Sequence, residues 1–210
     1  MATTQIKKMT TMAMLMGIMI IMGLTPLGSI PLPFMKATTT HIPVIMAAIL
    51  YGWKTGAIFG LGFGVVSVIR STLMPNLTSF AFSPFVPIPG SDSGSWKALL
   101  IAFVPRICIG LFAAAWYKLL SGHTSKKVCY MVCGVIGSIT NTALVLGMIY
   151  LLLGREYAIA QGIGSDALLG LLCGVVFSNG IGEAIVAAVL TSALLSTADY
   201  ISARAVHHRT

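Results

Sequence analysis

The chain has 210 residues, of which 57% are hydrophobic and only 9% are charged, and its mean hydropathy is +0.94. A soluble domain carries roughly a quarter charged residues and lacks repeated apolar runs long enough to cross a bilayer, so a cytosolic enzyme, a secreted disulfide scaffold and a disordered tail are excluded. The net charge of +8 does not indicate nucleic acid, because the basic residues lie at the ends of apolar segments, as topology signals do.

Runs of about 20 apolar residues predict an all-α, polytopic membrane protein with six transmembrane helices in one domain over residues 1–210. Lys7 and Lys8 before the first run resemble a signal peptide, but no small-x-small cleavage site follows, so we keep this run as a span. The second run has only about 14 residues, or about 21 Å of helix, so it should start below the membrane surface or thin the bilayer. The expected spans are 9–24, 38–51, 55–74, 96–120, 128–153 and 166–198.

The basic residues predict the orientation of these spans. Eight of them fall on one face of a six-span arrangement and three on the other, which makes the richer face cytoplasmic and places both termini there. The richer face holds Lys7, Lys8, Lys54, Lys118, Lys126, Lys127, Arg204 and Arg209, and the other holds Lys36, Lys97 and Arg155.

The outer loops are richer in proline than the inner connections. Seven of the nine prolines lie in the first two outer loops. Residues 82–95, FSPFVPIPGSDSGS, cannot form regular helix. We expect Phe82, Phe85, Val86 and Ile88 to pack over the bundle as a lid; a disordered proline-rich loop is the alternative.

Ionisable residues inside the membrane are costly, and are therefore candidates for function. Arg106 lies about 15 Å below the outer boundary and should face a polar cavity. Arg70 is near the outer end of its span, where it can either bind substrate or extend to the surface. Glu183 and Asn179 share one face of the sixth span.

Asn141 lies near the middle of the fifth span, where it serves either as a ligand contact or as a hydrogen-bonding link between helices. Together Arg106, Asn141, Asn179 and Glu183 suggest a site for a small polar molecule with an anionic end. An internal Arg106–Glu183 ion pair without ligand is the alternative. His41, before Pro43, is expected to be a satisfied residue at a span boundary.

Other chemistries find little support in the sequence. The four cysteines lie inside apolar runs, so we expect no disulfide, metal site or cofactor. The sequence contains no GxxxxGK[ST], HExxH or GxSxG motif, so we expect neither ATP hydrolysis by this chain nor enzymatic catalysis. Small residues at four-residue spacing permit close helix contact on the first, third and sixth spans.

Residues 40–52, THIPVIMAAILYG, followed by TGAIFGLGFG at 55–64, resemble the substrate-binding S components of energy-coupling factor (ECF) vitamin transporters of bacterial plasma membranes. The segments FVPR (103–106), GSITNT (137–142) and NGIGE (179–183) look most like the pantothenate-specific members. The resemblance implies a six-helix protein that captures a vitamin at the outer face. It also implies a transmembrane coupling subunit, docked on Ala13 and Gly17 of the first span, and two ATPase subunits.

Pantothenate fits the site chemistry, since its carboxylate suits Arg106 and its amide and hydroxyl groups suit Asn141 and Asn179. An S component for another vitamin such as riboflavin, a stand-alone carrier, an intramembrane enzyme using Glu183 and a purely structural role remain alternatives.

Overall fold

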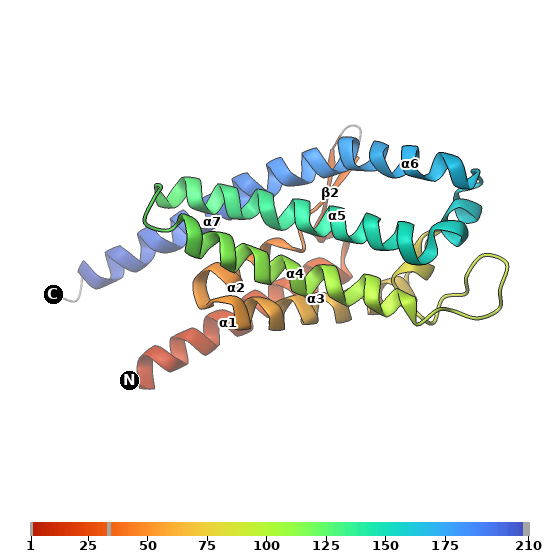
Figure 1. Cartoon of the computed structure of the whole chain (residues 1–210). Coiled ribbons are helices and arrows are strands. Elements are labelled where there is room, and N and C mark those ends of the chain that lie inside the picture. The colour runs from red at the N-terminus through yellow and green to blue at the C-terminus, as the bar shows by residue number, and fades with distance from the viewer. Residues whose placement is uncertain (1, 33–34, 208–210) are drawn as a thin grey trace.

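The computed structural model describes residues 2–32 and 35–207, most of which form helices running along one bundle (Figure 1). Two short strands, β1 (Ser29–Leu32) and β2 (Met35–Thr38), form a hairpin between the first two helices. The helices are α1 (Ala2–Leu24), α2 (Ile42–Tyr51), α3 (Trp53–Leu73), α4 (Lys97–Leu120), α5 (Lys126–Gln161), α6 (Leu168–Val175) and α7 (Ile181–His207).

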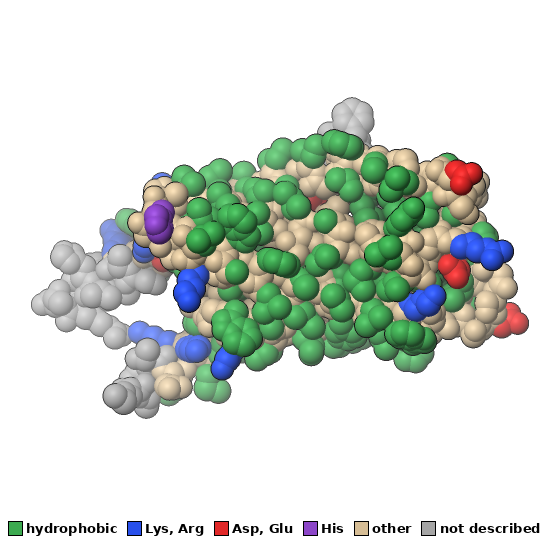
Figure 2. Space-filling model, viewed as in Figure 1, with side chains coloured by type: hydrophobic (Ala, Val, Ile, Leu, Met, Phe, Trp, Pro, Cys, Tyr) green, Lys and Arg blue, Asp and Glu red, His purple; other side chains and the backbone are tan. Residues whose placement is uncertain are grey.

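Five helical stretches of the described chain are long and apolar enough to cross a membrane, which confirms the predicted all-α class. Hydrophobic side chains cover the middle of the molecule, and Lys, Arg, Asp and Glu gather toward its two ends (Figure 2). Large apolar side chains such as Ile58, 63% exposed, and Ile185, 60% exposed, are suited to contact with lipid.

The bundle has two distinct ends. We call the end where α1 begins and α7 ends the terminal end, and the opposite end, where α3 and α4 are connected, the loop end (Figure 1). Both termini therefore lie on one side of the bundle, while the assignment of that side to the cytoplasm remains a prediction.

Helix α2 occupies the centre of the bundle and is shorter than the sequence predicts. Its 10 residues span about 15 Å, half of a bilayer core, because Thr38 belongs to β2 and helix begins only at Ile42. Residues 42–49 are all buried, which explains why this helix is apolar all round rather than amphipathic.

Glycines bring α3 and α4 into close contact. Gly56 meets Gly110, and a Cβ on Gly60 would collide with the backbone carbonyl of Arg106. Helix packing thus uses the small residues of the third span as predicted. The small residues of the sixth span do not all behave this way, since a Cβ on Gly170 or Gly174 would meet no atom within 4 Å.

The last two predicted spans differ from the structure in their boundaries. Helix α5 continues to Gln161 beyond non-helical backbone angles at Leu153, whereas a C-terminus at 153 is predicted. The sixth span is one helical stretch, Ser165–Ile201, in which a π-helical turn, Val176–Gly180, lies between α6 and α7. The sequence Ser178-Asn179-Gly180 has low helix propensity, which favours an irregular turn there.

The hairpin was not predicted, and it lies against this irregular turn. Strands β1 and β2 pair antiparallel from Ser29 opposite Thr38 to Leu32 opposite Met35. Pro31 is tolerated because both strands of a two-stranded sheet are edge strands. Strand β2 contacts both the π-helical turn and α7, so the hairpin brings backbone from the start of the chain to the sixth span.

Candidate functional site

A polar cavity of about 280 Å³ lies between α1, the hairpin, α3, α4 and the connection between α3 and α4. Two arginines, Arg70 and Arg106, line it together with the ring of Phe82. No carboxylate is among the described residues that line it. Its hydroxyl groups come from Thr38, Thr40, Ser67, Ser71, Thr78 and Ser79. A cavity with two cations, several hydroxyls and no acid is suited to a small anionic molecule.

Arg106 is held in place by a backbone carbonyl that Pro105, the residue before it, leaves free. Pro105 has no N–H, so the carbonyl of Ile101 loses its helical partner. Nη1 of Arg106 donates to that carbonyl at 2.7 Å, and Nη2 donates to Oγ of Ser67 at 3.3 Å. The Pro-Arg pair therefore turns a break in the helical hydrogen bonding into an anchor for a guanidinium that is only 6% exposed.

Two aromatic rings complete the surroundings of this guanidinium. Its Cζ lies 5.4 Å from the ring centroid of Phe63 on α3 and 5.1 Å from that of Phe82 in the loop. Such contacts stabilise a cation away from water without neutralising its charge. The positive charge of Arg106 thus remains available to a ligand, as the sequence predicts for a residue facing a polar cavity.

The loop that contributes Phe82 packs over the loop end of the bundle. Phe82, Val86 and Ile88 are partly buried against a hydrophobic cluster that contains Phe80. The sequence predicts this packing correctly for these three side chains. It is wrong for Phe85, which is 74% exposed and follows Pro84 away from the bundle.

Within the loop, Asn76 organises the turn that carries two hydroxyls of the cavity, those of Thr78 and Ser79. Its Oδ1 accepts from the backbone N–H of Thr78 at 3.0 Å and from the hydroxyls of Thr78 and Ser79. Ser79 Oγ in turn accepts from the N–H of Asn76 at 2.8 Å. This network rigidifies the wall of the cavity that faces Arg70 and Arg106.

Glu183 is bound to the hairpin rather than to an arginine. Its Oε1 accepts from the backbone N–H of Thr38 at 2.9 Å. The one ion pair found among the described residues joins Lys126 to Asp199, so the structure has no Arg106–Glu183 pair there. Glu183 therefore joins β2 to α7.

The two predicted amides do not line the polar cavity. Asn141 lies on α5, and its buried Oδ1 has no hydrogen-bond partner in the described part of the chain. Asn179 lies half-buried in the π-helical turn. Of the five predicted binding residues, the structure brings Arg70 and Arg106 together in the cavity. Asn141, Asn179 and Glu183 are not among the described residues that line this cavity.

His41 is a polar residue whose role the sequence interpretation missed. It was expected to be satisfied at a boundary, but its side chain is 0% exposed and neither ring nitrogen has a hydrogen-bond partner among residues 2–32 and 35–207. The signal in the sequence that could have predicted this burial was the position of His41 directly before a fully apolar helix. When such a helix is buried in the core, the polar ring next to it is buried too.

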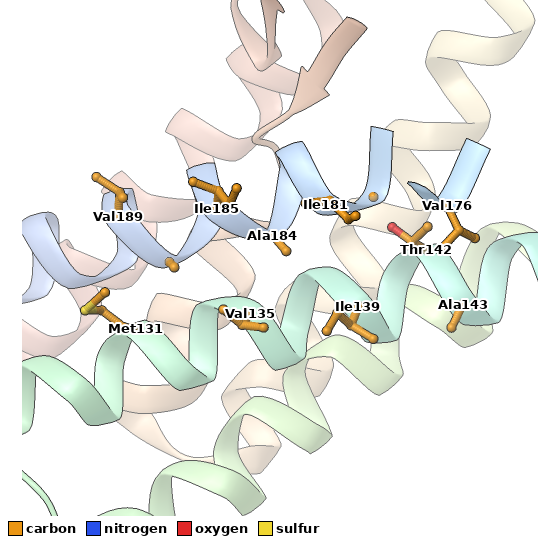
Figure 3. A pocket seen from close by; sticks show the side chains of 12 residues that line it. Met131, Val135, Ile139, Thr142, Ala143, Val176, Ile181, Ala184, Ile185 and Val189 are labelled. Atoms are coloured by element: carbon orange, nitrogen blue, oxygen red, sulfur yellow. The ribbon is translucent and has the colours of Figure 1, made fainter. Parts of the chain in front are cut away.

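A second hollow is separate from the polar cavity. It is a groove of about 530 Å³ between α5 and α7, lined by apolar side chains such as Ile139 and Ile185 (Figure 3). Thr142 supplies the hydroxyl group in its lining. A groove of this composition is matched to hydrocarbon rather than to a charged solute.

The predicted docking face on α1 is open. Ala13 is exposed, and a Cβ on Gly17 would meet no atom within 4 Å. Ala13 also borders a groove of about 380 Å³ between α1 and α3, which includes Met12 and Ile58. The described chain therefore leaves this small-residue face without an internal helix against it.

Comparisons with known proteins agree with this arrangement. The sequence model of the family described as "ECF transporter, substrate-specific component" matches residues 7–195. The chain is 36% identical over 165 residues to the pantothenic acid transporter PanT of Lactococcus lactis subsp. cremoris (strain MG1363), covering 79% of this chain and 78% of that protein. A crystal structure of the S component for biotin from an ECF-type ABC transporter superposes with a TM-score of 0.52 at 18% identity, covering 93% of this chain and 94% of that chain. The chain therefore belongs to the substrate-specific components of ECF transporters, multi-pass proteins of the bacterial plasma membrane.

Proposed function

We propose that this chain captures pantothenate from outside the cell and presents it for ATP-driven uptake by separate subunits. The observation that carries the proposal is the uncompensated Arg106 in the polar cavity, with Arg70 in the same lining. The relative named for pantothenic acid transport, 36% identical over most of the chain, points to the same substrate.

The carboxylate of pantothenate matches the charge of the cavity. A guanidinium presents N–H donors in a planar fork that fits a carboxylate, and such charge-assisted hydrogen bonds are about twice as strong as neutral ones. The ring of Phe82 and the hydroxyls of the loop then enclose the ligand from the loop end. In this proposal the loop end faces the outside, and both termini lie in the cytoplasm.

Riboflavin fits this cavity less well, because it has no carboxylate for the arginines. An S component for that vitamin would leave Arg106 as a buried cation without a role in binding. Biotin carries a carboxylate, but the biotin-binding relative is related by fold alone, at 18% identity.

In this proposal ATP-driven delivery uses partner subunits, because the sequence has no nucleotide-binding motif. We propose that a transmembrane coupling subunit docks on the α1 face around Ala13 and Gly17, and that two ATPase subunits act through it. The open side of Gly17 supports this placement, since small residues let the backbones of membrane helices approach closely.

Titration calorimetry of the purified chain with pantothenate tests the proposal, with riboflavin as the control ligand. We expect one-to-one binding of pantothenate with a Kd on the order of 1 µM or tighter, and no heat with riboflavin. Proteoliposomes that contain this chain alone test the partner requirement. Uptake of labelled pantothenate by the chain alone would contradict the partner-dependent mechanism and favour a stand-alone carrier.

A further inference from the structure

A polar layer crosses the bundle just above the point where α2, α4 and α5 meet. At that point Ile45 and Ile109 both lie over Gly137, because a Cβ on Gly137 would stand 2.5 Å from Cδ1 of Ile45 and 3.4 Å from Cγ2 of Ile109. This contact fixes the relative heights of the three helices. Residues one helical turn away from it, about 5.4 Å along each axis, are therefore at similar depth.

Three polar residues occupy the next turn toward the loop end. Helices α2 and α4 run away from the loop end and α5 runs toward it, so the next turn lies earlier in α2 and α4 and later in α5. His41 is four residues before Ile45, Arg106 three residues before Ile109, and Asn141 four residues after Gly137.

These side chains have polar atoms without partners. His41 Nδ1 and Nε2, Arg106 Nε and Asn141 Oδ1 are buried, and the described residues offer them no hydrogen bond. Ser138, beside Gly137, has a buried Oγ in the same state and is 0% exposed. Buried polar groups in folded proteins are nearly always paired, so unpaired ones at neighbouring heights are available to hydrogen-bond a polar ligand.

Apolar residues lie on both sides of the layer along α4 and α5. The layer lies between two hydrophobic clusters: on α4 between Ile101 and Ile109, and on α5 between Cys133 and Val145. Arg106 connects it to the polar cavity, because the same residue lines that cavity and carries one of the unpaired atoms.

We infer that His41, Ser138 and Asn141 form a neutral hydrogen-bonding subsite for the hydroxyl and amide groups of the ligand whose carboxylate lies with Arg106 and Arg70. This inference rests on the proposed function. The chemistry is complementary, because an imidazole and a hydroxyl can each donate and accept, and an amide oxygen accepts. The subsite determines specificity for the uncharged part of the ligand.

Two variants test the subsite by titration calorimetry of the full chain with pantothenate. His41→Phe removes both ring nitrogens and keeps an aromatic ring, and Ser138→Ala removes a single oxygen. Each should weaken pantothenate binding about tenfold or more, as expected for a lost buried hydrogen bond. Thr191→Val is the matched control, because Thr191 Oγ1 is also buried and unpaired among the described residues but lies on α7 outside the layer. It should bind like the wild type.

Pantothenol, which has an alcohol in place of the carboxylate, separates the two parts of the site. The subsite variants should weaken pantothenol and pantothenate by the same factor, whereas an Arg106 substitution should affect pantothenate far more. The melting temperature of ligand-free Ser138→Ala should not fall, because its hydroxyl has no partner to lose. A fall would indicate a structural hydrogen bond and contradict the inference.

The outcomes separate this inference from the proposed function. Wild-type protein that binds pantothenate while Ser138→Ala and a folded His41→Phe retain full affinity would overturn the subsite, leaving the unpaired atoms to water. Wild-type protein that binds no pantothenate would overturn both. If His41→Phe does not fold, the pantothenate affinity of Ser138→Ala alone tests the subsite.

Discussion

Replacing Arg106 with lysine should weaken pantothenate binding although the positive charge is kept. The guanidinium already donates to the carbonyl of Ile101 at 2.7 Å and to Ser67 at 3.3 Å, with further N–H groups left for a ligand. A lysine ammonium is a single point of charge and cannot reproduce that planar fork. Loss of one charge-assisted hydrogen bond, about 1.5–3 kcal/mol, corresponds to roughly 10- to 150-fold weaker binding.

The assay is titration calorimetry of Arg106→Lys and wild-type protein with pantothenate and pantothenol. The wild type should prefer pantothenate, and the variant should lose most of that preference. Arg155→Lys, a substitution of an exposed arginine on α5 outside the cavity, is the control and should bind normally. Binding of pantothenate by Arg106→Lys within about twofold of the wild type would refute the argument that the fork holds the carboxylate.

Three further substitutions test other parts of the account. Glu183→Ala removes the acceptor that anchors the hairpin, so hydrogen exchange at residues 29–38 should accelerate. Glu183→Gln keeps an oxygen acceptor and should retain most of the protection against exchange. Equal exchange rates in both variants would contradict the role of Glu183 as the anchor of the hairpin. Gly60→Ala forces a Cβ onto the backbone of α4 and should lower the free energy of unfolding by about 1–3 kcal/mol, measured as a lower melting temperature. Gly147→Ala is the control, because a Cβ there has open space and should change the melting temperature little. A similar decrease in both variants would argue against the close α3–α4 contact. Gly17→Leu should leave pantothenate binding intact but abolish ATP-dependent uptake with the partner subunits, and normal uptake would place the docking face elsewhere.

The helices were the most predictable part of the fold, because long apolar runs have few alternatives in a membrane. Their boundaries were less predictable, since they depend on local backbone features such as the π-helical turn between α6 and α7. The hairpin escaped prediction because Pro31 reads as a loop signal, although an edge strand tolerates it.

The depth of each candidate site residue in the membrane could be predicted from the sequence, but the direction in which its side chain points around the helix axis could not. Pro105 followed by Arg106 in an apolar run correctly indicated an arginine that faces a polar cavity. Asn141, Asn179 and Glu183 were assigned to one site because they lie at similar heights. The structure instead bonds Glu183 to the hairpin, which no sequence pattern had indicated.

His41 shows the limit of reading residues one at a time. A lone histidine beside a proline resembles a helix boundary, and only the burial of α2 on every side shows that its ring lies in the core without a hydrogen-bond partner among the described residues.

An experimental structure of the chain with pantothenate bound tests the central claim most directly. The account predicts the ligand carboxylate in the polar cavity, within about 3 Å of the Arg106 guanidinium. A carboxylate located away from Arg106, or a ligand lying in the apolar groove between α5 and α7, would contradict it.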